Sequence, residues 1–128
     1  MACHLTIVDD DEDLAALYRL VAENVGMDIS RYDNGADFVH SDLNRAQIVL
    51  LDLMLPQMDG VQVLRRLAKA EFKYPIILFS GYDMGALKVA REEATSHELN
   101  VISTLTKPVD VEVLEMLLLE ACEHNSLK

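Results

Sequence analysis

Short apolar runs alternate with longer stretches of helical spacing along the whole chain. Such runs of β-branched and aliphatic residues, each ended by polar or turn-forming residues, predict strands. Five of them occur, at Leu5–Val8, Met27–Tyr32, Ile48–Leu51, Ile76–Phe79 and Val101–Leu105. Because helical segments separate these strands, we expect a parallel sheet with right-handed crossovers and helices on both faces. Without any linker or repeat in the sequence, residues 1–128 are predicted to form one α/β domain.

Five helical patterns separate and follow the strands. They run from the acidic residues before Leu14 to Val25, from Ala36 to about Asn44, from Asp59 to Phe72, from Asp83 to Leu99, and from Pro108 to about His124. Gly26 is typical of a helix stop, and Asp33-Asn34-Gly35 indicates a turn and a cap before the second helix. Pro108 suits the first turn of the last helix, where its missing N–H would have no partner.

The last helix is more apolar than one buried face requires. Its apolar residues are Val111, Val113, Leu114, Met116, Leu117, Leu118, Leu119 and Ala121. A core stripe at helical spacing accounts for about half of them. The others, Met116 and Leu119 above all, predict a surface for a partner or for a homodimer, formed together with the fourth helix.

The charge balance narrows the classes of partner. The 128 residues include 11 basic and 22 acidic side chains, which gives a net charge of -11, and 51% of the chain is apolar. A chain this acidic is not expected to bind nucleic acid by itself or an anionic membrane surface. No stretch of about 18 apolar residues predicts a membrane span. The charge leaves room for a cation site.

Two cysteines, Cys3 and Cys122, lie near opposite ends of the chain. A disulfide between them would join the termini. The start of the chain has no basic segment followed by a long apolar one, so we expect no secretory signal. The sequence therefore favours reduced thiols and a cytoplasmic location.

Polar side chains that could take part in binding or catalysis follow four of the five strands. Asp9 and Asp10 come after the first strand and Asp52 after the third, while Ser80 follows the fourth and Lys107 the fifth. In a parallel sheet all these strand ends lie at one edge, which is where ligands bind in open α/β folds. The alternative is a set of independent caps and turns in which Lys107 balances the acids.

Convergence of these groups predicts a cation site with a nucleophile. Clustered carboxylates repel one another without a cation, and oxygen ligands favour a hard ion such as Mg²⁺. Lys107 and Ser80 supply a positive charge and a hydrogen bond, which suit a transferred phosphoryl group. Asp52 is then the carboxylate available as nucleophile.

Four motifs make the chain resemble a receiver domain of two-component response regulators. They are IVDDD at 7–11, LLDLMLPQMDG at 50–60, FSG at 79–81 and TKP at 106–108. The resemblance covers essentially the whole chain. It implies a flavodoxin-like, doubly wound five-stranded parallel sheet with strand order 2-1-3-4-5.

The resemblance also implies residue roles. Asp52 would accept the phosphoryl group from the phosphohistidine of a histidine kinase or a histidine phosphotransfer protein. Asp9, Asp10, Asp52 and the backbone carbonyl of Met54 would hold Mg²⁺, and Ser80 and Lys107 would bind the phosphoryl oxygens. Gly60 would match the turn after the central loop, and Pro108 would follow Lys107 through a bend that is often a cis peptide. Such a domain is a switch rather than an enzyme.

Three features depart from the family pattern. Thr104 stands where members usually have Tyr or Phe, so we expect signalling to rely on the loop at 81–86 and the helix after it. Bulky Met54 and Tyr82 lie two residues beyond Asp52 and Ser80, which predicts slow loss of the phosphoryl group. The segment from Ser80 to Lys107 is longer than usual by about one helical turn.

This longer segment gives a weaker likeness to receivers fused to EAL cyclic-di-GMP phosphodiesterases, so the receiver part of such a regulator is one alternative. A second is a protein-interaction module that keeps the fold without being phosphorylated; Thr104 favours it, whereas the complete acidic site disfavours it. A third is a Mg²⁺-dependent phosphohydrolase. Such enzymes carry a second acid two residues after the nucleophile, where this chain has Met54.

Overall fold

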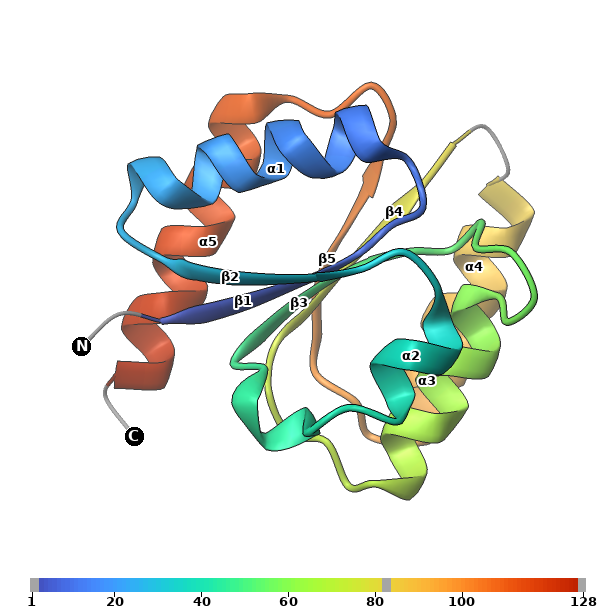
Figure 1. The fold of residues 1–128 in the computed structure, drawn as a ribbon. Coiled ribbons are helices and arrows are strands. Elements are labelled where there is room, and N and C mark those ends of the chain that lie inside the picture. Colours follow the sequence, from blue (N-terminus) through green and yellow to red (C-terminus); the bar gives the residue numbers. More distant parts are fainter. Residues whose placement is uncertain (1–2, 82–83, 127–128) are drawn as a thin grey trace.

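Residues 3–81 and 84–126 are described by the computed structural model, and they form a five-stranded parallel sheet between two layers of helices (Figure 1). The strands are β1 His4–Val8, β2 Asp28–Tyr32, β3 Ile48–Asp52, β4 Ile76–Ser80 and β5 Val101–Thr106. Their order is β2-β1-β3-β4-β5 and every pairing is parallel. The predicted doubly wound, flavodoxin-like fold is confirmed.

Helices cover both faces of this sheet. Helices α1 (Glu12–Asn24) and α5 (Val111–Ser126) pack side by side on one face (Figure 1). The other face carries α2 (Gly35–Val39), α3 (Gly60–Lys69) and α4 (Met84–Ser96). No helix among the described residues is both long enough and apolar enough to cross a membrane.

Strand β3 lies at the centre of the sheet and is buried along its whole length, as its unbroken apolar run predicts. Its side chains alternate between two hydrophobic clusters. Ile48 and Leu50 pack in the cluster under α1 and α5, whereas Val49 and Leu51 pack in the cluster under α2, α3 and α4. The strand pairs in register with β1 and β4 and delivers Asp52 to the carboxyl edge of the sheet.

Helices α3 and α4 end three residues earlier than the apolar pattern predicts. Glu71 and Glu98 adopt left-handed backbone conformations, with φ of 57° and 59°. The next N–H groups turn back into each helix: Phe72 donates to the Leu67 carbonyl at 3.0 Å and Leu99 to the Ala94 carbonyl at 2.9 Å. These are Schellman-type ends, in which apolar residues after the helix still pack on the core.

Two other boundaries differ from the prediction. The second helix ends at Val39, where the Ser41 hydroxyl donates to the Phe38 carbonyl at 2.6 Å, and a separate 3-10 helix covers Leu43–Arg45. Pro108 does not lie in the first turn of α5. Asp110 caps that helix instead, because its carboxylate accepts the Glu112 N–H at 2.9 Å.

The expectation of two reduced thiols is wrong for this structure. Cys3, directly before β1, forms a disulfide with Cys122 in α5 across 119 residues of chain. The bond joins the α5 side of the molecule to the beginning of the sheet. The pattern of apolar residues gave no signal for it, since both cysteines occupy ordinary core positions.

Candidate functional site

Asp52 ends strand β3 and is only 3% exposed. Its two carboxylate oxygens have different partners. Oδ1 accepts the Met54 N–H at 3.0 Å, and Oδ2 accepts from Lys107 Nζ at 3.1 Å. The carboxylate is therefore held in one orientation by a backbone amide on one side and an ammonium on the other.

Asp9 and Asp10 follow β1 at the same edge of the sheet. Asp9 is buried, and its Oδ1 accepts the Asp11 N–H at 2.9 Å. Its Oδ2 lies 3.7 Å from Lys107 Nζ and has no hydrogen-bond partner among the described residues. Asp10 is exposed. One carboxylate oxygen from each of Asp9, Asp10 and Asp52 lies within 4.8 Å of the others.

This cluster fits a hard divalent cation. Burial, followed by the charges of Asp52 and Asp10, raises the pKa of Asp9 from 3.8 to about 6, although the Asp11 N–H and Lys107 oppose the shift. A cation would offset the repulsion among the three carboxylates and would give Asp9 Oδ2 a partner. Mg²⁺ prefers oxygen ligands of this kind and keeps several waters. The three carboxylates therefore fit a cation of this kind, and Mg²⁺ at this site stays a prediction.

Ser80 and Lys107 are the remaining predicted site residues at the carboxyl edge of the sheet. Ser80 ends β4 and is 1% exposed, one residue beyond Phe79, which is the register partner of Asp52. The Lys107 N–H donates to the Ser80 carbonyl at 2.8 Å, which ties the end of β5 to the end of β4. The peptide bond from Lys107 to Pro108 is cis, as the family resemblance implied.

Two of the three residues that depart from the family pattern, Met54 and Thr104, are among the described residues. Met54 is 64% exposed in the loop after β3. Its carbonyl as a metal ligand stays a prediction. Thr104 is half-buried in β5 opposite Leu78 of β4, and Tyr82 lies outside the described residues.

Sequence reasoning missed one contact of this site. Arg31 of β2 donates from Nε and Nη2 to the backbone carbonyl of Asp9, at 3.3 and 3.0 Å. The available signal was weak: a basic residue near the end of an edge strand that neighbours the acidic turn.

A comparison with family models supports the resemblance to receiver domains. The model of the response regulator receiver domain matches residues 5–118. The chain belongs to this family. It is a receiver domain of two-component signalling, and the phosphate-accepting role that the sequence predicts is the standard role of such domains.

Curated relatives of this receiver are longer proteins. It is 32% identical over 126 residues to the transcriptional regulatory protein YkoG of Bacillus subtilis (strain 168), covering 98% of this chain and 53% of that protein. It is 30% identical over 125 residues to the transcriptional regulatory protein GlrR of Escherichia coli (strain K12), covering 96% of this chain and 27% of that protein. The receiver thus spans between a quarter and about half of these relatives.

Solved structures agree on the fold. A response regulator from Colwellia psychrerythraea superposes with a TM-score of 0.85 at 37% identity, over 97% of this chain and 99% of that one. The signal receiver domain of a Luxo repressor protein from Vibrio parahaemolyticus gives a TM-score of 0.84 at 20% identity, over 99% of this chain and 95% of that one. The second likeness concerns the fold alone.

Proposed function

We propose that this receiver accepts a phosphoryl group on Asp52 from the phosphohistidine of a histidine kinase or a histidine phosphotransfer protein. The observation that carries the proposal is the buried Asp52 carboxylate, 3.1 Å from Lys107 Nζ and clustered with Asp9 and Asp10. Mg²⁺ would be held by these three carboxylates and the Met54 carbonyl. When bound, it would neutralise charge on the incoming phosphoryl group.

The reaction moves one phosphoryl group between two side chains. A carboxylate oxygen of Asp52 attacks phosphorus, an O–P bond forms, the N–P bond of the phosphohistidine breaks, and the imidazole leaves with the electron pair. A carboxylate nucleophile needs no general base, because it has no proton to lose before it attacks. Lys107 then shifts its hydrogen bond from Asp52 to a phosphoryl oxygen, and the Ser80 hydroxyl donates to another. Most of the catalysis is positioning and charge neutralisation.

The proposal treats residues 1–128 as a single receiver domain that works as a switch and turns over no separate substrate. It includes a cytoplasmic location, where histidine kinases present their phosphohistidine. The phosphohydrolase alternative lacks support, since Met54 occupies the position of the second acid and is exposed. The weaker likeness to receivers of cyclic-di-GMP phosphodiesterases stays a prediction.

Intact mass spectrometry tests the proposal directly. The protein is incubated with acetyl phosphate, with and without Mg²⁺, beside Asp52→Ala. Asp13→Ala serves as a matched control, because it removes an exposed acid from the first turn of α1. We expect a Mg²⁺-dependent gain of one phosphoryl group in the wild type and in Asp13→Ala, and none in Asp52→Ala.

The possible failures of this experiment are distinct. Mg²⁺ binding without phosphorylation, repeated with a phosphorylated histidine kinase as donor, would favour the interaction module that keeps the site without using it. Neither Mg²⁺ binding nor phosphorylation would overturn the phosphoryl-transfer function. If Asp52→Ala still gains the mass of one phosphoryl group, the acceptor is a residue other than Asp52.

A homodimer through α4 and α5 is a second part of the proposal. Met116 and Leu119 of α5 are 56% and 40% exposed, and Val89 of α4 is 52% exposed. These apolar side chains support the surface predicted from the sequence. Sedimentation of the phosphorylated protein should show a dimer that Met116→Glu abolishes, whereas Leu20→Glu, at an exposed apolar position of α1, should leave it intact.

A further inference from the structure

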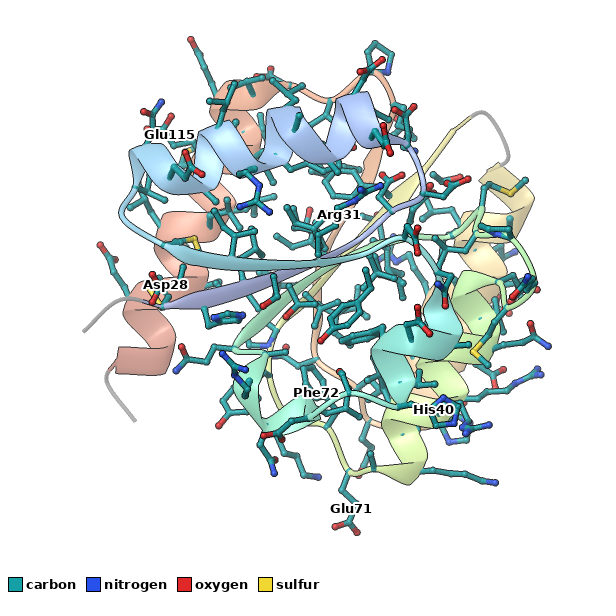
Figure 2. The ribbon with its side chains drawn as sticks, viewed as in Figure 1. Asp28, Arg31, His40, Glu71, Phe72 and Glu115 are labelled. Carbon is teal, nitrogen blue, oxygen red and sulfur yellow. A yellow bond between two sulfur atoms is a disulfide. The ribbon has the colours of Figure 1, made fainter. Side chains whose placement is uncertain are left out.

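The turn from β1 to α1 carries two of the three candidate cation ligands and is held by a residue from the neighbouring strand. Arg31 is the fourth residue of β2 and pairs in register with Ile7 of β1. Its guanidinium donates twice to the Asp9 carbonyl, from Nη2 at 3.0 Å and from Nε at 3.3 Å. Figure 2 labels Arg31 between the sheet and helix α1, close to this turn.

Asp9 is consequently fixed at three separate points. Its N–H donates to the Tyr32 carbonyl at 3.1 Å, its carbonyl accepts the two Arg31 hydrogen bonds, and its Oδ1 accepts the Asp11 N–H at 2.9 Å. The first contact continues the pairing of β1 with β2, and the third stays within the turn. Of these three contacts, the pair from Arg31 acts on the carbonyl of the peptide that joins Asp9 to Asp10, so it is the one that holds this peptide plane.

We infer that Arg31 is a positioning residue for the cation site, which holds the peptide between Asp9 and Asp10 so that both carboxylates converge with Asp52. This inference rests on one part of the proposed function, the cation site at Asp9, Asp10 and Asp52, and not on the phosphoryl transfer itself. Arg31 contacts a backbone carbonyl and would not itself touch the cation or the phosphoryl group.

Arginine suits this task for geometric reasons. Its planar guanidinium presents Nε and Nη2 in a fixed fork, and here both donate to one oxygen. Lysine would keep the charge but would offer a single ammonium on a flexible stem. Methionine would keep much of the length without any donor.

Because Arg31 is positively charged, the direction in which Mg²⁺ affinity changes when Arg31 is replaced decides between a positioning role and simple charge repulsion. A positive side chain near a cation site weakens cation binding by repulsion, so its removal alone should tighten Mg²⁺ binding. Loss of positioning should have the opposite effect, since outer contacts that orient metal ligands commonly change affinity by roughly tenfold or more. The two roles of Arg31 therefore predict shifts in opposite directions.

The experiment measures Mg²⁺ binding by calorimetry in the wild type, Arg31→Met and Arg31→Lys. Arg19→Met is the matched control, because it removes the same charge from an exposed position on α1. We expect the Mg²⁺ dissociation constant to rise about tenfold in Arg31→Met. We expect a smaller rise in Arg31→Lys, and an unchanged or lower constant in Arg19→Met. Urea midpoints confirm that each variant is folded.

A second readout needs no metal. Amide hydrogen exchange in the metal-free protein reports on the Asp11 N–H, which the turn directs to Asp9 Oδ1. Exchange at Asp11 should accelerate in Arg31→Met, whereas the Met54 N–H, which is bonded to Asp52, should keep its rate.

An unchanged Asp11 exchange rate, or a Mg²⁺ dissociation constant that falls in Arg31→Met as in Arg19→Met, overturns the positioning role. A wild type that binds Mg²⁺ but is never phosphorylated would contradict the proposed function and leave this inference standing. A wild type that binds no Mg²⁺ would overturn the proposed cation site, and with it the inference.

Discussion

Burial makes the negative charge of Asp9 unfavourable in the absence of a cation. Its pKa is raised to about 6, chiefly by burial, whereas its ordinary value is 3.8. The folded protein therefore binds a proton at Asp9 before the unfolded chain does as the pH falls. Its charge destabilises the fold above about pH 6, and this cost disappears as the pH falls toward 3.8.

The substitution Asp9→Asn removes this cost, because the amide resembles the protonated acid. In metal-free buffer at pH 8 we expect the variant to be more stable than the wild type by about 1 to 2 kcal/mol, after allowance for solvent screening. The difference should shrink to near zero at pH 4. Urea unfolding with a chelator at both pH values measures it, and a difference independent of pH would contradict the raised pKa.

Met54 lies two residues beyond the proposed acceptor and is 64% exposed. Its thioether cannot orient a water for attack on an acyl phosphate, whereas an amide can. Met54→Asn should shorten the lifetime of phosphorylated Asp52 by about threefold, equivalent to ~0.7 kcal/mol in the barrier. Intact mass followed over time after removal of the donor measures this lifetime.

The control for Met54 is Leu20→Asn, which changes a similarly exposed apolar residue on α1, away from the proposed dimer surface. It should leave the lifetime unchanged. A lifetime that Met54→Asn leaves equal or longer would show that Met54 does not shield the phosphoryl group.

Individual site residues could be predicted wherever strand ends determine position. Asp9, Asp52 and Lys107 follow strands, and parallel strands bring their ends to one edge, so their convergence needed no structure. Arg31 could not be found this way. It lies inside a strand and acts across two strands through a backbone carbonyl, which no side-chain pattern reveals.

At the scale of elements, helix starts were easier to predict than helix ends. Asn34 and Asp59 cap α2 and α3 with side-chain oxygens, and both are visible as capping residues in the sequence. Three helices end in the same left-handed turn, but only the first places a glycine there, at Gly26 with φ of 79°. Glu71 (labelled in Figure 2) and Glu98 adopt the same left-handed conformation although neither is a glycine, so the sequence does not predict these two helix ends.

Gly60 begins α3 where the helix presses against the loop after β3. A Cβ at this position would lie 2.5 Å from Leu53 Cδ2 and 2.7 Å from Leu53 Cα. Because the backbone cannot yield cheaply, Gly60→Ala should lower the free energy of unfolding by about 2 kcal/mol. Urea denaturation measures the change.

Gly81→Ala is the matched control, since an added Cβ there would meet no described atom within 4 Å. It should change stability by less than ~0.5 kcal/mol. Equal effects of the two substitutions would mean that the contact with Leu53 is not the cause.

Helix α4 is the element expected to respond to phosphorylation. Thr104 is too small to act as the aromatic switch of the family, whereas α4 begins at Met84, only four positions after Ser80 in the sequence. It packs on the sheet through Leu87, Ala90 and Ala94, and we expect the two small alanine contacts to let the helix shift. An ion pair of 2.7 Å between Arg65 and Glu93 connects it to α3.

Amide chemical shifts with and without beryllofluoride and Mg²⁺ test this expectation. Residues 85–89 should shift strongly and residues 103–105 weakly. Thr104→Ala should leave the response of α4 intact, because the readout does not depend on that side chain. Changes confined to β5, or loss of the α4 response in Thr104→Ala, would assign the switch to Thr104 instead.

For the whole molecule, the strand order 2-1-3-4-5 was implied by the resemblance to receiver domains. The alternation of strands and helices by itself predicts only a parallel sheet with helices on both faces. The alternation of strands and helices does not predict the disulfide. Both cysteines lie in the cluster under α1 and α5, where a thiol packs as a small apolar group, so their proximity becomes visible only when the chain is folded. The bond also conflicts with the reducing compartment expected for this receiver, since disulfides persist mainly in oxidising ones.

The disulfide should make the stability of the molecule depend on redox conditions. Cys3 and Cys122 are 119 residues apart, so the bond restricts nearly the whole unfolded chain. On the chain-entropy argument, Cys3→Ser should lower the free energy of unfolding by about 3 to 5 kcal/mol in oxidising buffer. Urea denaturation with and without dithiothreitol measures this, and Cys122→Ser should behave alike. Reduced wild type should match both variants. The opposite outcome is a wild-type urea midpoint that dithiothreitol does not change, in a protein whose two thiols react with an alkylating reagent before reduction. It would mean that packing alone holds the termini.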